Sequence, residues 1–223
     1  MFVRKTSIPA KTIMGLAISI GVLADLIKHD PEGAEWVRAD FEQVNRVLSK
    51  CNLPAHTEPE ILPTLESRKK AGGFPYPFLH FLRRAYARVK ADPGRQPAPV
   101  PEGQDPADDP VYREIESDFD SHLICHSDAE GYYVPIDFEE VIFDARVRGG
   151  MLGSTIRLMG ELITVAPYID IPLSDGYLSD ETAELLSLES EYSSPFWVER
   201  LVWFVLYENA RLSIEHKTAI RFG

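Results

Sequence analysis

The stretch SPFWVERLVWFVLYENARLSI, residues 194–214, joins a helix-start signal to a long apolar run. Its Ser-Pro dipeptide favours the first turn of a helix, because proline suits the first helical position. The run that follows contains Trp197, Trp203, Phe204 and Tyr207 among aliphatic residues. Charged residues recur too often for a membrane span: Glu199, Arg200, Glu208 and Arg211. We therefore predict a buried aromatic helix at the centre of the fold.

Elements of the N-terminal part are predicted from periodicity and capping. Residues 14–21 alternate large apolar with small side chains, which indicates a strand. Residues 22–29 predict a short helix. The dipeptide Asp30-Pro31 predicts the cap and first turn of a second helix, which runs to about Lys50. The apolar stripe of this second helix is predicted to be Trp36, Val37, Phe41, Val44, Val47 and Leu48.

Residues 1–13 are expected to form a leader outside the domain. Basic residues before the apolar run at 13–24 imitate a secretory signal peptide, so secretion stays an alternative. The two cysteines, Cys51 and Cys125, make no disulfide framework and favour a reducing compartment. We expect a cytoplasmic protein without a membrane segment.

A clear helix is predicted to begin at Pro77, with Arg83, Arg84, Arg88 and Lys90 on its exposed side. This basic face could bind anions in a regulatory module, face solvent, or pair with acidic side chains elsewhere in the chain. Residues 92–110 are rich in proline and acidic residues, which is typical of a flexible loop.

Further helices are predicted over 155–165 and from Ser179 or Asp180 onward, and residues 218–222 favour a closing strand. In the helix after Ser179 the side chains expected to point inward are Leu185, Leu186 and Leu188. Together these elements predict a helix-rich α+β fold with a small antiparallel or mixed sheet. We expect one domain over residues 14–223, carrying the loop at 92–110.

The net charge of −12 is distributed unevenly along the chain. Residues 1–95 are slightly basic, whereas residues 96–145 carry 14 acidic residues and a single arginine. Such an acidic region repels phosphate backbones, so the composition argues against nucleic-acid binding. A basic protein partner would be attracted. The oligomeric state is left open.

Residues 119–138 gather two histidines, four acidic residues, a cysteine and two tyrosines in one window. The pattern predicts two strands around a tight turn, in which Asp128 bonds the turn backbone and Gly131 adopts a positive φ. His122 and His126 would then lie too far apart to bind one metal. Cys125 is expected to be a buried, inert thiol.

Three interpretations of this turn stay open: a structural turn, a protein-recognition loop, or a metal or acid–base site. The candidate ligands or catalytic groups are His126, Asp128 and Glu130, with the distant His216 as a further catalytic candidate. No cofactor is predicted, and a divalent metal is the alternative. The sequence contains no G-x-S-x-G motif, no P-loop and no G-x-G-x-x-G motif.

Several segments resemble an uncharacterised family of bacterial proteins. These are GVLADL at 21–26, DPEGAEW at 30–36, HSDAEGYYVP at 126–135 and RLSIEH at 211–216. The resemblance spans Met14 to Phe222. It implies a bacterial cytosolic setting and brings no activity with it.

The absence of a catalytic motif favours a binding protein over an enzyme. We expect a bacterial cytosolic factor, of immunity or accessory type, that faces a basic protein partner. The residues predicted to contact this partner are Asp118, Asp120, Asp128 and Glu130. The alternative is a small metal-dependent or acid–base hydrolase centred on His126, Asp128 and Glu130.

Overall fold

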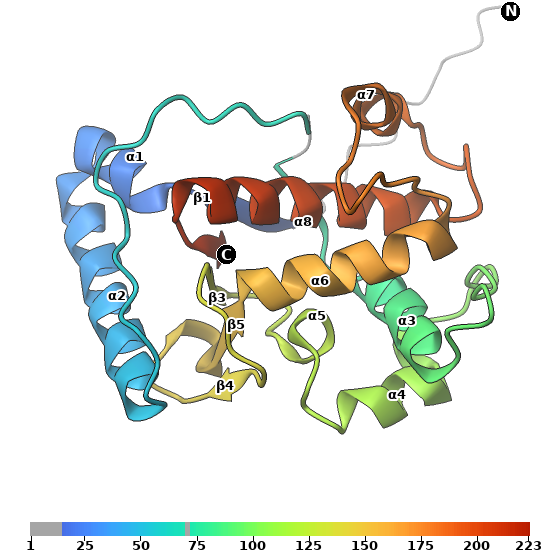
Figure 1. Cartoon of the computed structure of the whole chain (residues 1–223), viewed down its shortest axis with the longest axis horizontal. Coiled ribbons are helices and arrows are strands. Elements are labelled where there is room, and N and C mark those ends of the chain that lie inside the picture. Colours follow the sequence, from blue (N-terminus) through green and yellow to red (C-terminus); the bar gives the residue numbers. More distant parts are fainter. Residues whose placement is uncertain (1–14, 70–71) are drawn as a thin grey trace, which may run out of the picture.

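The computed structural model describes residues 15–69 and 72–223, and the predicted leader at 1–13 lies outside this part of the chain. Figure 1 shows the helices packed around a small sheet. The α-helices are α1 Val22–His29, α2 Pro31–Lys50, α3 Phe78–Ala91, α4 Pro110–Glu116, α5 His122–Cys125, α6 Thr155–Val165, α7 Asp180–Leu188 and α8 Trp197–His216. The 3₁₀ turns are η1 Pro106–Asp108, η2 Arg148–Gly150 and η3 Ala166–Ile169. The predicted α+β class is confirmed.

The sheet is mixed and has the strand order β2-β1-β6-β3-β5-β4. Its strands are β1 Gly15–Ile20, β2 Gly73–Pro75, β3 Gly131–Val134, β4 Ile142–Phe143, β5 Met151–Ser154 and β6 Ile220–Phe222. Only β3 and β5 pair in parallel, and the other neighbours are antiparallel. Because Ile18 pairs with Phe222, strands from the two ends of the domain lie side by side at its centre.

Helices cover both faces of this sheet. Tyr132 and Val134 point to the core formed with α1 and α2, whereas Tyr133 between them joins the larger core under α3, α6 and α8. This explains why all four residues of β3 are buried, since a strand covered on both faces has no solvated side.

The central helix α8 confirms the prediction from residues 194–214. Trp203 is fully buried, donates its indole N–H to the carbonyl of Leu162 at 2.7 Å and stacks on Tyr207. Glu208 and Arg211, three residues apart on this helix, form an ion pair at 3.1 Å. Among the described helices, none is long and apolar enough to cross a membrane.

The prediction that four basic side chains of α3 face solvent is wrong for two of them, Arg83 and Arg84. Arg83 and Arg84 are 2% and 7% exposed. The Arg83 guanidinium donates to the carbonyls of Leu123 at 2.7 Å and His126 at 2.6 Å, and it also pairs with Asp128. The alternative in which these arginines pair with acidic side chains of the same chain is the one the structure shows.

The prediction of a strand before the turn at 126–131 is also wrong, because residues 122–125 form the helical turn α5. The Ser121 hydroxyl accepts the N–H of Ile124, and the Glu161 carboxylate accepts the N–H groups of His122 and Leu123 at 2.9 and 2.6 Å. An acceptor 38 residues away therefore satisfies the first turn of α5. Local sequence patterns do not contain this information.

Three apolar side chains that were predicted to pack inward are exposed. Trp36 on α2 is 68% exposed, and Leu185 and Leu188 on α7 are each 63% exposed. In α7 only Ala183 and Leu186 reach the core. The helix is therefore attached by a narrow stripe, and its outer face carries uncovered apolar groups.

Replacing Arg83 by methionine should lower the free energy of unfolding by about 3 kcal/mol, because two buried carbonyls and Asp128 lose their donor. Urea unfolding followed by tryptophan fluorescence measures this loss. Arg113→Met is the control, since Arg113 and its partner Asp108 are both exposed, and it should change stability by less than about 0.5 kcal/mol. Equal losses in the two variants would contradict the anchoring role of Arg83.

Candidate protein-interaction surface

Residues 102–120, here called the acidic segment, cross the surface through η1 and α4. Asp105 accepts the N–H of Ala107 at 2.9 Å, and Asp109 accepts the N–H of Val111 at 3.0 Å. Each aspartate is followed by a proline at the first helical position. These Asp-Pro caps fix where both helical turns begin.

Two arginines of α3 anchor the acidic segment to the body of the protein. Asp109 is 8% exposed and accepts from Arg84 Nε and Arg88 Nε, both at 2.7 Å. Burial opposes ionisation of Asp109, but these two cations and the Val111 amide lower its pKa overall. Tyr112 is 2% exposed and completes the anchor from the inner face of α4.

The remaining carboxylates of the acidic segment are exposed: Glu102, Asp105, Asp108, Glu114, Glu116, Asp118 and Asp120. Asp108 pairs with Arg113, and Asp120 pairs with Lys90 of α3. Five have no cationic partner within the described part of the chain: Asp105, whose carboxylate caps η1, and four whose carboxylates cap no helix, Glu102, Glu114, Glu116 and Asp118. These four present negative charge that no neighbouring cation offsets.

The four residues predicted to contact a partner differ in how free they are. Asp118 is exposed and has no ion pair among the described residues. Asp120 pairs with Lys90, Asp128 with Arg83 and also with His80 at 3.4 Å, and Glu130 with Arg148 at 3.3 Å. Their assignment as partner contacts stays a prediction, and Asp118 is the member that the geometry leaves most available.

His126 lies inside the protein and not on the surface of the turn. It is 2% exposed, its ring stacks on Tyr133 with centroids 4.0 Å apart, and Phe222 covers its edge. Its two nitrogens face the carbonyls of Ser127 at 3.1 Å and Tyr132 at 3.2 Å. Burial lowers its pKa to about 4, so the ring is neutral at physiological pH.

The candidate metal or acid–base residues do not converge on one point. His126 faces backbone carbonyls, while Asp128 and Glu130 turn to different arginines. His216 lies at the end of α8, 3.7 Å from Glu215. Over residues 15–69 and 72–223, no group of three His, Cys, Asp or Glu side chains is arranged to hold a metal ion. The hydrolase alternative stays a prediction without a contact that supports it.

Sequence reasoning missed the helix that carries the acidic segment. Residues 110–116 were not predicted to be helical, although Asp109-Pro110 is the same signal that correctly placed the start of α2 at Asp30-Pro31. It also did not predict Glu114 and Glu116 as unpaired surface carboxylates. Whether they are paired depends on the arginines of α3, and Arg84 and Arg88 pair with Asp109 instead.

Comparison with known families agrees with an acidic binding surface. The chain matches the family described as "Putative DNA-mimic protein" over residues 14–222. The chain belongs to this DNA-mimic family. The matched span coincides with the resemblance from Met14 to Phe222, whereas the His-Ser-Asp motif as its signature stays a prediction. No curated protein and no solved structure matches the chain.

Two carboxyls of this DNA-mimic family member have pKa values that are raised by burial. Burial raises the pKa of Glu161 to about 7, and the backbone amides that it accepts at α5 oppose this shift. Burial also raises the pKa of Glu199 in α8 to about 7. Glu199 is 2% exposed, so its charge has little access to water.

Chelation should leave the protein unchanged, because His126, Asp128 and Glu130 are each held by partners inside the chain. We expect the melting temperature to stay within about 1 °C when EDTA is added, since loss of a bound metal would lower it. Elemental analysis of the purified protein is the companion measurement. A stoichiometric metal whose removal lowers the melting temperature would restore the hydrolase alternative.

Glu199→Gln should flatten the dependence of stability on pH. The folded pKa of about 7 lies above the ordinary glutamate value of 4.5, so the stabilising contribution is complete below about pH 4.5 and is lost as the pH rises through about 7. The wild type should therefore lose up to about 3 kcal/mol more than the variant over this interval.

Urea titrations at a series of pH values measure this difference. The lowered pKa of His126 makes its contribution to stability change with pH in the opposite direction. Because His126 is present in both proteins, this contribution cancels in the comparison. Glu191→Gln, at an exposed position, is the control and should follow the wild type. Parallel curves for wild type and Glu199→Gln would contradict the assignment.

Proposed function

We propose that this protein binds the DNA-contacting surface of a basic DNA-binding protein. In this proposal, exposed carboxylates of the acidic segment take the places of backbone phosphates. The observation that carries it is the set of four carboxylates of the acidic segment that, among the described residues, neither pair with a cation nor cap a helix, in a chain that belongs to the DNA-mimic family. The four are Glu102, Glu114, Glu116 and Asp118.

The chemistry of phosphate contacts makes this substitution feasible. DNA-binding proteins direct half or more of their hydrogen bonds to phosphate and sugar, largely from Arg and Lys. A carboxylate offers the same partner an anionic acceptor, and its two oxygens match the fork of a guanidinium. The contacts that give a DNA-binding protein its general affinity are therefore open to a protein with suitably placed acids.

The acidic segment is also held rigidly enough to present these groups. Asp109 is fixed by Arg84 and Arg88, and the buried Tyr112 packs α4 against α3. Anchored acceptors lose less conformational freedom on binding than acids on a free loop. The net charge of −12 adds long-range attraction for a basic partner and repulsion from DNA itself.

A narrower version of this proposal is a bacterial cytosolic factor of immunity or accessory type. The sequence basis for this version is that two cysteines, Cys51 and Cys125, make no disulfide framework of the kind common in secreted proteins. In this version the DNA-binding partner is the protein whose activity the factor restrains or assists.

Competition with DNA tests the proposal. The immobilised protein is used to capture partners from a nuclease-treated lysate of the source organism, and a short DNA duplex is added to displace them. A captured protein is then purified, and anisotropy of a labelled duplex reports its release when the acidic protein is added. We expect the duplex and the acidic protein to compete for one surface, with affinity that falls as salt is raised.

Removing three charges from the acidic segment should weaken this competition about tenfold or more, through Glu114→Gln, Glu116→Gln and Asp118→Asn together. The matched control removes three exposed charges from α2 with the same change in net charge: Glu32→Gln, Glu35→Gln and Glu42→Gln. It should stay within about twofold of the wild type. Equal effects of both triple variants, or capture that DNA does not reverse, would refute the proposed site.

A further inference from the structure

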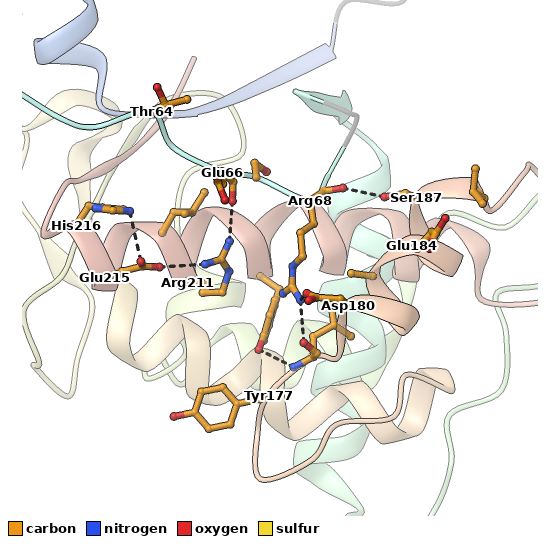
Figure 2. A pocket seen from close by; sticks show the side chains of 16 residues that line it. Thr64, Glu66, Arg68, Tyr177, Asp180, Glu184, Ser187, Arg211, Glu215 and His216 are labelled. Carbon is orange, nitrogen blue, oxygen red and sulfur yellow. Dashed lines mark hydrogen bonds and ion pairs between the residues drawn. The ribbon is translucent and has the colours of Figure 1, made fainter.

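A groove lies between the segment 64–68, α7 and α8, on the side of α8 away from α4. Its volume is about 770 Å³, which is in the range of pockets that bind ligands or short peptide segments. Figure 2 shows Glu66 and Thr64 on one wall, Glu184 on the other, and Tyr177 at the lower opening. In Figure 1, α4 and α7 lie on opposite sides of α8, so this groove is separate from the acidic segment.

The two arginines that line the groove are fully engaged by the protein itself. Arg68 donates two bonds from its guanidinium to the buried Glu208, at 2.6 and 3.1 Å, and a third to Asp180 at 2.9 Å. Arg211 donates to Glu208 as well, and to Glu215 at 3.0 Å. Their charges are therefore neutralised in place, and the groove offers no free guanidinium to an anion.

Unlike these arginines, two carboxylates that line the groove have no ion pair within the described residues. Glu66 and Glu184 are exposed, and neither side chain has an ion pair within the described residues. They come from opposite walls, with Arg68 and Asp180 between them in Figure 2. The surrounding sequence reinforces this field, because residues 170–191 contain seven acidic residues and no Lys, Arg or His. The electrostatics of the groove therefore favour a cation.

Apolar side chains border the same groove. Tyr177 is 74% exposed and Leu188 is 63% exposed, and both line it. Among the large apolar side chains exposed in the described chain, four of ten fall within residues 177–192. Such a concentration of uncovered apolar area marks an interaction surface more often than a monomer's ordinary exterior.

We propose that this groove binds an extended segment of a partner protein in which Lys or Arg side chains stand next to aliphatic ones. The cationic heads lie between Glu66 and Glu184, and the aliphatic groups cover Tyr177 and Leu188. Lys and Arg suit both features, because their long apolar stems pack on such surfaces while the charged ends reach the carboxylates. This site is additional to the acidic segment and does not depend on its function.

A phage-displayed random peptide library, panned on the purified full-length protein, tests the chemistry of the occupant. We expect enriched peptides to combine Lys or Arg with Leu, Ile or Val. Labelled copies of these peptides then report affinity by fluorescence anisotropy. Enrichment of acidic peptides, or of none, would overturn the proposal.

Matched variants on α7 locate the site. Glu184→Lys and Leu188→Ser should each weaken peptide binding about fivefold or more, because both side chains line the groove. Glu181→Lys and Leu185→Ser change the same residue types at exposed positions outside it, and should leave the affinity within about twofold. All four side chains are exposed, so the variants should fold, which circular dichroism verifies.

Equal losses in both pairs would show that the peptide binds α7 generally and would refute the groove. The triple variant Glu114→Gln, Glu116→Gln and Asp118→Asn separates this proposal from the previous one. It should keep full affinity for the peptides while losing competition with DNA. Loss of peptide binding in that variant would assign the peptides to the acidic segment.

Discussion

A guanidinium cannot remain buried without acceptors, and this constraint at Arg83 organises the middle of the protein. Its bonds to the carbonyls of Leu123 and His126 tie α3 to the turn that leads into β3. The Arg83 guanidinium also forms an ion pair with Asp128, so this acid of the His-Ser-Asp motif binds a buried arginine of the same chain. His126 is thereby held neutral against Tyr133, and the motif becomes part of the structure between helix and sheet.

Internal arginines also decide which acids are left for the surface. Arg84 and Arg88 converge on Asp109, while Arg68 and Arg211 share Glu208 and also pair with Asp180 and Glu215 respectively. At Asp109 two arginines of α3 are engaged by one carboxylate, so neither of them offsets the exposed carboxylates of the acidic segment. A surface of unbalanced carboxylates is the property that the DNA-mimic family name implies, and here it has a structural cause.

Local signals in the sequence were sufficient for most of the fold. The Asp30-Pro31 cap, the alternation in β1 and the aromatic run of α8 each depend on neighbours within a few residues. The errors at Arg83 and in α5 share one cause: the deciding partner is distant in sequence, Leu123 for Arg83 and Glu161 for α5. For the candidate site, an acidic partner surface was predicted, but not which carboxylates stay unpaired, since that depends on tertiary pairing. Helical periodicity alone likewise predicts that Leu188 packs inward, whereas it is exposed.

The pairing of β1 with β6 has a consequence for how the chain folds during synthesis. Gly21 and Thr218, at the ends of these strands, are joined by a hydrogen bond across 197 residues. The free side of β1 thus stays an open strand edge until residues 218–222 have left the ribosome, although α1 and α2 can form beside it much earlier. Contacts of such long range close slowly, and an open apolar edge invites wrong pairing in the meantime. This topology therefore exposes the nascent protein to wrong strand pairing until the centre of its sheet is filled.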